Sequence, residues 1–216
     1  MIIAGFIFVD IRNTKLLKTV THPGRGTRSE RKLVLKLLKN GVHPKAIFHD
    51  LYIRNSNGTF SQIDLAIATP VGILVFEVKD YSGWIFGKGN QRQWTQVLAY
   101  GKEKHRFYNP VMQNRTHINN LQKQLRQFDN IPFYSIIVFY GSCVFRDVSF
   151  IPDGTFLIKP YQVIEAMNFI TRSNQPAKYT NKSEVSNVLR QGVSNGANIE
   201  IRIRHSENIR NMLWRQ

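Results

Sequence analysis

The feature that most constrains this chain is a pair of apolar runs joined by a tight turn, QIDLAIATPVGILVFEVKDY, over residues 62–81. The turn contains Pro70 and Gly72, and the pattern is typical of an antiparallel β-hairpin. Asp64 and Glu77 interrupt the apolar runs, although an ionised carboxylate in such surroundings is costly unless it is paired or bound to a metal. We therefore expect a compensating group beside them.

The composition favours a folded domain with a polyanionic partner. The chain has 216 residues, of which 42% are hydrophobic, and this is enough for one domain with a sizeable core over residues 1–216. Lys and Arg outnumber Asp and Glu by 30 to 14, which gives a net charge of +16. Such a charge favours nucleic acid or an anionic membrane surface as partner.

Two further features bear on location and redox state. Met1–Val9 is too short to span a bilayer, follows no secretory pattern, and is expected to form a strand. We therefore expect a cytoplasmic protein without stable membrane insertion. The single cysteine, Cys143, excludes an intramolecular disulfide and a cysteine-based zinc site, and it is expected in the core.

The hydrophobic periodicity predicts an α/β domain with a mixed central β-sheet flanked by α-helices. One helix is expected over Gly26–Asn40, and another begins after Asn109 with Pro110 at its first position. The segment Tyr81–Trp94 is expected to extend the sheet as an edge hairpin. The remaining expected elements are strands over 46–53, 60–69, 73–79, 133–140 and 154–158 and helices over 161–170 and 182–191.

Asp64, Glu77 and Lys79 form the candidate catalytic group. Asp64 and Glu77 lie on consecutive strands, and Lys79 shares the face of Glu77 because side chains alternate along a strand. A hard divalent cation, Mg²⁺ or Mn²⁺, would relieve the repulsion between the carboxylates, with the backbone carbonyl of Val78 as a further ligand. Such an ion activates water and stabilises phosphodiester charge, and Lys79 would orient or deprotonate the water. The competing interpretation is a salt bridge on a solvated face.

The order of these residues resembles the PD-(D/E)XK nuclease superfamily, in which an acid precedes a Glu-x-Lys. The segments GTRSERKLVLKLL, SQIDLAIATPVGILVFEVKDYSGWIFG and YNPVMQNRTHINNL are similar to the nuclease-related domain (NERD) family, best over residues 26–128. The resemblance implies a restriction-endonuclease-like core and metal-dependent hydrolysis of nucleic acid, with DNA as the expected substrate. It makes Asp64 and Glu77 metal ligands, makes Lys79 the assistant of the attacking water, and places Glu30 at the superfamily's first-helix acid. The Pro-Asp pair that names the superfamily is Ile63-Asp64 here, which leaves the acid in place.

Three more polar residues are candidates for the site. Gln62 lies two residues before Asp64 and can hydrogen-bond a carboxylate or a DNA phosphate. Gln113 and His117 lie one turn apart at the start of a helix, where backbone N–H groups favour anions. The alternatives are an exposed strand glutamine and a surface histidine, although Gln113 matches the motif of the family.

Basic segments flank an acid-rich segment, 46–87, that contains the candidate metal site. Trp94, Tyr100 and Phe107, interleaved with Lys and Arg, could stack exposed bases or belong to the core. The tail 199–215 is a second basic strip, residues 160–216 being expected to hold C-terminal helices and this tail. Without a base-reading motif, sequence-independent binding is expected. The candidate nucleic-acid contacts are Lys88, Arg92, Arg106, Arg115 and His117.

These observations leave two main hypotheses. The first is a Mg²⁺-dependent nuclease acting on DNA, and the second is a non-catalytic nucleic-acid-binding module of the same fold that acts with a partner enzyme. A third, attachment to anionic membranes through the N-terminus, is disfavoured by the strand-like alternation of Met1–Ile11. No pattern supports a protease, an NTPase or a zinc protein. DNA against RNA, endo- against exonucleolytic cleavage, and homodimerisation stay open.

Overall fold

A computed structural model describes residues 11–128, 130–178 and 181–213, so the strand expected at Met1–Val9 lies outside the described residues. A five-stranded sheet in the order β1-β2-β3-β7-β9 forms the centre. β1, β2 and β3 pair antiparallel, whereas β7 pairs parallel with both β3 and β9. The expected α/β fold with a mixed sheet is therefore confirmed. The strands are β1 (Ile47–Arg54), β2 (Phe60–Thr69), β3 (Gly72–Asp80), β7 (Phe133–Tyr140) and β9 (Thr155–Ile158).

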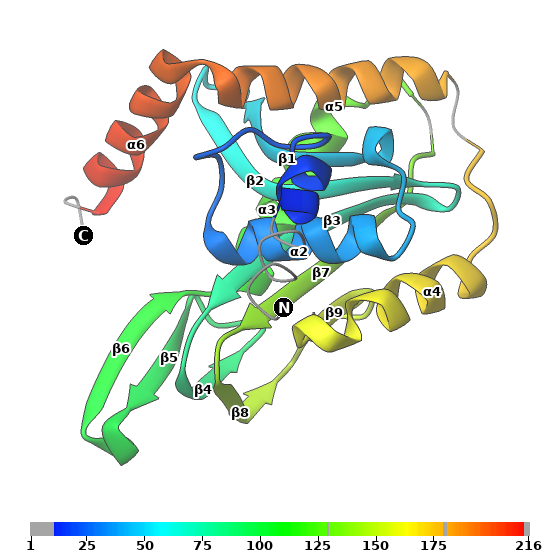
Figure 1. Ribbon diagram of the computed structural model, residues 1–216. Coiled ribbons are helices and arrows are strands. Elements are labelled where there is room, and N and C mark those ends of the chain that lie inside the picture. The colour runs from blue at the N-terminus through cyan, green and yellow to red at the C-terminus, as the bar shows by residue number, and fades with distance from the viewer. Residues whose placement is uncertain (1–10, 129, 179–180, 214–216) are drawn as a thin grey trace.

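Helices cover both faces of this sheet (Figure 1). α2 (Arg28–Lys39) and α4 (Val163–Ser173) pack on one face, where Leu33 and Leu37 join a core with Leu74 and Phe76. α3 (Pro110–Gln124) and α5 (Lys182–Ala197) pack on the other face. The alternation of apolar side chains along β3 supplies both cores, which explains why this strand reads as a continuous apolar run.

The last helix, α6 (Ile199–Leu213), occupies the expected basic tail. It projects from the end of α5 and touches the body through His205, whose Nδ1 lies 2.8 Å from the carbonyl oxygen of Phe60. Within the described part of the chain, no helix combines the length and the apolar character that crossing a membrane requires.

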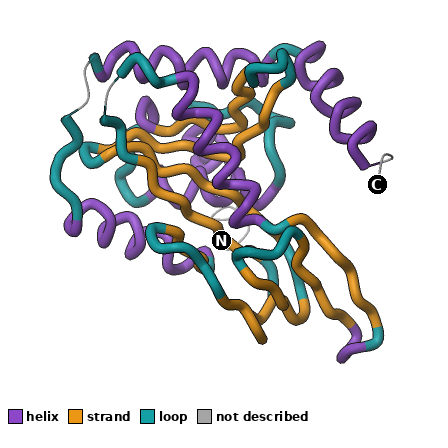
Figure 2. Tube along the Cα trace, turned by 180° about the vertical axis from the view of Figure 1, so that it is seen from behind, coloured by secondary structure: helices purple, strands orange, loops and turns teal. Residues whose placement is uncertain are grey.

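The prediction that Tyr81–Trp94 extends the central sheet is wrong. β4 (Gly83–Lys88) and β5 (Gln93–Leu98) belong to a second sheet in the order β6-β5-β4-β8, with β6 (Glu103–Tyr108) and β8 (Cys143–Ser149). This sheet extends away from the helices that cover the first one (Figures 1 and 2). Cys143 is buried there, as expected.

The two sheets separate where both strands of a parallel pair, β3 and β7, are interrupted. β3 and β7 pair in parallel as far as Asp80 and Tyr140. The same two segments of the chain pair again from Gly83 and Cys143 onward, as β4 and β8. Gly83 and Gly141 have positive φ, 75° and 76°, which other residues adopt only at a cost. A Cβ at Gly141 would lie 2.2 Å from the carbonyl oxygen of Tyr81, so a side chain does not fit.

Asn109 fastens the second sheet to α3. Its Oδ1 accepts hydrogen bonds from the N–H groups of Val111 and Met112, which caps the helix as expected. Its Nδ2 also donates to the carbonyl oxygens of Lys88, Gly89 and Gln91 in the β4–β5 turn. The side chain is fully buried. One amide therefore fixes the start of α3 relative to the second sheet.

We predict that Asn109→Ala lowers the free energy of unfolding by roughly 2–4 kcal/mol, because it removes a helix cap and leaves buried carbonyls unpaired. Urea unfolding followed by circular dichroism measures the change. Asn198→Ala is the matched control, since Asn198 caps α6 at an exposed position; it should cost about 1 kcal/mol or less. Equal losses in the two variants would contradict the role assigned to Asn109.

Candidate active site

The candidate site lies where the β2–β3 pairing ends. The pair farthest from the hairpin turn is Leu65 and Phe76, and Asp64 directly precedes Leu65 in the sequence. There the Oδ2 atom of Asp64 accepts a hydrogen bond of 2.7 Å from the backbone N–H of Val78. A side chain thus satisfies a backbone group of β3 where the described ladder stops, which fixes the carboxylate against the strand that carries Glu77.

Glu77 is buried, with 1% of its surface exposed. Its Oε1 lies 2.7 Å from Nζ of Lys79, and its Oε2 lies 3.3 Å from Nε2 of His117 on α3. Lys79 also donates a hydrogen bond of 3.0 Å to Oε1 of Gln113. These contacts bring together four of the expected site residues. The burial of Glu77 argues against the alternative of a salt bridge on a solvated face.

Glu30 and His49 form a second buried pair on the α2 side. Oε2 of Glu30 lies 3.3 Å from Nε2 of His49, and Nδ1 of His49 lies 2.8 Å from Oγ1 of Thr21. Thr27 caps α2 and donates to Oε1 of Glu30 at 2.8 Å. Burial raises the pKa of Glu30, but the nearby His49 ring and the hydrogen bonds with Thr27 outweigh it, so this pKa lies below its ordinary value.

Gly26 makes room for this pair. A Cβ at Gly26 would lie 2.4 Å from Nε2 of His49 and 2.6 Å from Oε2 of Glu30, and the residue has a φ of 69°. Any other residue would therefore both strain the backbone and displace the two side chains. The space that the Glu30–His49 pair needs therefore explains why the segment GTRSERKLVLKLL begins with a glycine.

The carboxylates of Glu30, Asp64 and Glu77 influence one another. Burial raises the pKa of Asp64 well above its ordinary value, and the negative charges of Glu77 and Glu30 raise it further. The hydrogen bond from Val78 and the charge of Lys79 act in the opposite direction but do not compensate. If all three were ionised, these carboxylates would carry more negative charge than the cations of the site neutralise.

Glu77 and Lys79 are charged together. Burial raises the pKa of Glu77, but the nearby His117 ring and the charge of Lys79 outweigh it, and the pKa lies below its ordinary value. Burial likewise lowers the pKa of Lys79, but Glu77 outweighs it, and the pKa lies above its ordinary value. Lys79 is therefore a hydrogen-bond donor at neutral pH.

The donor set fits a hard divalent cation in charge and chemistry. Oε2 of Glu30 and Oε2 of Glu77 are buried and have no hydrogen-bond partner in the described part of the chain. Together with Asp64 they supply carboxylate oxygens, the ligands that Mg²⁺ and Mn²⁺ prefer. Among the described residues, however, no three His, Cys, Asp or Glu side chains already surround one point. Glu77 is turned toward Lys79 and His117, so it must exchange a partner to act as a ligand.

The other expected site residues lie in three places. Gln62 donates a hydrogen bond of 2.9 Å to Oδ1 of Asp50, so it binds a carboxylate, but not that of Asp64. His117 is buried against Glu77 and is not a surface histidine. The four expected basic contacts are all exposed: Lys88 on β4, Arg92 in the β4–β5 turn, Arg106 on β6 and Arg115 on α3.

Sequence reasoning missed the roles of His49 and Asn114. His49 lies in β1, and its signal was a His-Asp pair inside an otherwise apolar strand. Asn114 is fully buried and donates to the carbonyl oxygen of Val75 and to Oγ of Ser135, which ties α3 to β3 and β7. Its signal was the position directly after Gln113 in the segment YNPVMQNRTHINNL.

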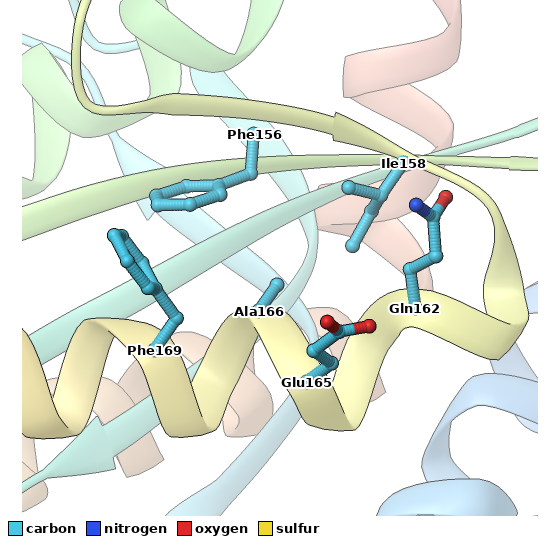
Figure 3. A pocket seen from close by; sticks show the side chains of 6 residues that line it. All are labelled: Phe156, Ile158, Gln162, Glu165, Ala166 and Phe169. Atoms are coloured by element: carbon cyan, nitrogen blue, oxygen red, sulfur yellow. The ribbon is translucent and has the colours of Figure 1, made fainter.

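A hollow of about 300 Å³ lies elsewhere, between β9 and α4 (Figure 3). Phe156, Ile158, Ala166 and Phe169 form its apolar walls, and Gln162 and Glu165 lie at its edge. It contains none of the residues expected in the active site. The hollow is not part of the carboxylate cluster.

A family model and a relative match part of this sequence. The sequence model of the nuclease-related domain matches residues 25–140, more than half of the chain. An uncharacterized protein of Bacillus anthracis is 30% identical over 124 residues, which is 56% of this chain and 56% of the relative. The match thus spans little more than half of that protein. No solved structure matches significantly.

We predict that Asp64→Asn raises the thermal unfolding midpoint of the metal-free protein at pH 7. Because the native pKa of Asp64 lies above the ordinary aspartate value of 3.8, ionising this residue costs more in the native protein than in the unfolded chain, so its contribution to stability falls as pH rises above 3.8. The amide removes this cost and keeps an oxygen for the Val78 N–H. A gain of about 1 kcal/mol corresponds to roughly 2–4 °C.

Calorimetry in EDTA measures the midpoint, and Asp153→Asn serves as the control because Asp153 is exposed. The control should change the midpoint by less than about 0.5 kcal/mol in free energy. A midpoint of Asp64→Asn at or below that of the wild type would contradict the excess negative charge described above.

Proposed function

The chain belongs to the nuclease-related domain family, and from this premise we propose that it is a metal-dependent nuclease that hydrolyses phosphodiester bonds in DNA. One observation carries the proposal: Asp64, Glu77 and Lys79 meet at the end of the β2–β3 pairing, with Glu77 buried and paired to Lys79. Buried carboxylates that repel one another are found at functional sites more often than in structural cores.

The proposed ligands of Mg²⁺ or Mn²⁺ are Asp64, Glu77 and the carbonyl of Val78. A bound divalent ion supplies a water of lowered pKa and stabilises charge on the phosphodiester. Lys79 is held between Glu77 and Gln113, and its positive charge suits it to orient water and to stabilise a developing negative charge. In this arrangement Lys79 acts as a donor, and Gln113 positions it.

The residues around this group have supporting roles in the proposal. The ring of His117 lies 3.3 Å from the carboxylate of Glu77 and favours its ionised form, and His49 does the same for Glu30. Glu30 adds negative charge near Asp64 and is the candidate to hold a metal-bound water or a second ion. Gln62 acts at one remove, through Asp50.

A second candidate function is a nucleic-acid-binding module without turnover. The observation in its favour is that Glu77 is already engaged by Lys79 and His117 and that no ready group of three metal-binding side chains exists in the described residues. Both functions use the same net charge of +16 to bind a polyanion. They differ only in whether a metal ion produces cleavage.

We predict that Glu77→Gln lowers the rate of DNA cleavage by at least about 100-fold, because it removes a charged ligand and the partner of Lys79. Cleavage of supercoiled, linear and single-stranded DNA is measured with Mg²⁺ or Mn²⁺, beside an EDTA sample that should be inactive. DNA affinity measured in EDTA should change by less than about threefold, because the substitution is buried.

Glu103→Gln is the matched control, since Glu103 is an exposed glutamate on β6. It should cleave at the wild-type rate. A Glu77→Gln protein that cleaves normally would disprove the assignment of the site. A wild-type protein that binds DNA but yields no metal-dependent product would establish the second candidate function instead.

A further inference from the structure

The four-stranded sheet has two unlike faces, which its register defines. Trp94 and Phe107 are directly paired across β5 and β6, and directly paired residues lie on one side of a sheet. Trp94 is fully buried, and with Ile85 it belongs to the core shared with β7. Of the two alternatives for Trp94, a place in the core is the one observed, and it lies on the inner face.

The opposite face, which we term the outer face, carries two cross-strand rows. Trp84, Val97 and Lys104 form one row, and Phe86, Thr95 and Arg106 form the next. Trp84, Phe86 and Thr95 are partly exposed, and Lys104 and Arg106 are exposed. Side-chain alternation adds Lys88 and Tyr108 to the same face, where Tyr108 is 46% exposed.

Basic side chains lie close to aromatic rings on the outer face and beside it. The guanidinium of Arg146 lies 4.8 Å from the centre of the Trp84 ring, and Nζ of Lys88 lies 5.7 Å from the centre of the Phe150 ring. Lys104 and Arg106 border the face along the edge strand β6. Asp147, paired with Phe86, is the acid in these rows. Aromatic rings interleaved with Lys and Arg suit a strand that offers both base faces and phosphates.

The sheet that carries the outer face is connected to the candidate active site at two points along the chain. Only Tyr81 and Ser82 separate β4 from β3, which carries Glu77, and only Asn109 separates β6 from α3. The buried amide of Asn109 fixes this junction. The sheet that carries the outer face is therefore joined by one or two residues to each of the two elements that carry Glu77 and His117.

We propose that the outer face binds single-stranded DNA, with bases stacked on Trp84, Phe86 and Tyr108 and phosphates held by Lys88, Lys104, Arg106 and Arg146. Stacking requires unpaired bases, because a duplex hides the faces of its bases. Arg146, which covers Trp84, is placed to take a phosphate once a base stacks on the ring. This inference rests on the proposed function for its connection to cleavage, but binding is measured separately from it.

The test is fluorescence anisotropy in EDTA with a labelled oligothymidylate of about 20 nucleotides and a duplex of the same length. The wild type should bind the single strand more tightly than the duplex. Tyr108→Ala should weaken single-strand binding at least about fivefold, because it removes one stacking ring. Lys104→Gln with Arg106→Gln should reduce the slope of log K against log salt by about 1.4.

Two controls separate these effects from a change in fold or overall charge. Lys39→Gln with Arg172→Gln removes the same charges from exposed positions on α2 and α4 and should leave the slope unchanged. Trp84→Phe retains an aromatic ring. Made in a Trp214→Phe background, it should retain binding but lose most of the tryptophan quenching that the oligonucleotide causes, because the remaining tryptophan, Trp94, is buried.

Each outcome decides the inference. Unchanged single-strand affinity in Tyr108→Ala, an unchanged salt slope in the double variant, or full quenching in Trp84→Phe overturns it. Tighter binding of the duplex, weakened by the same substitutions, overturns the single-strand assignment. Metal-dependent cleavage by the same wild-type preparation is scored independently, so a failure of the proposed nuclease function is recognised as such.

Discussion

The rest of the structure depends on the burial of carboxylates that repel one another at the end of the β2–β3 pairing. Glu77 and Glu30 are buried and Asp64 is partly buried, and Lys79 with two histidines compensates Glu77 and Glu30 but not Asp64. Such an imbalance is costly in a core that serves stability alone. The divalent cation that we propose for this site would relieve the imbalance.

The surrounding fold holds this group in position from both faces of the central sheet. On one face, Thr27 and Gly26 at the start of α2 permit the Glu30–His49 pair. On the other face, Asn109 and Asn114 fix α3, so that residues on its first turns reach Glu77 and Lys79. The contacts of the candidate site are therefore made by regular elements, and the buried amides of Asn109 and Asn114 hold α3 in place. The amide of Asn109 also connects the second sheet to α3.

The sequence predicted the central meander, α2 and α3 because each has a clear periodicity and a cap or turn signal. It also indicated which residues meet around Glu77, since Lys79 follows two residues later and Gln113 lies in a recognisable motif. It did not predict the second sheet, because the weak alternation that follows Asp80 does not show that the backbone breaks at Gly83. His49 was missed because a histidine in an apolar strand reveals its partner only after α2 is packed on it.

The most direct measurement is calorimetric titration of Mg²⁺, and then Mn²⁺, into the metal-free wild type and into Asp64→Asn. If the buried carboxylates are a cation site, the wild type gives a saturable heat of binding, and Asp64→Asn, although folded, binds at least about tenfold more weakly. Equal binding by the two proteins, or no binding by the wild type under conditions in which it is folded, would contradict the account.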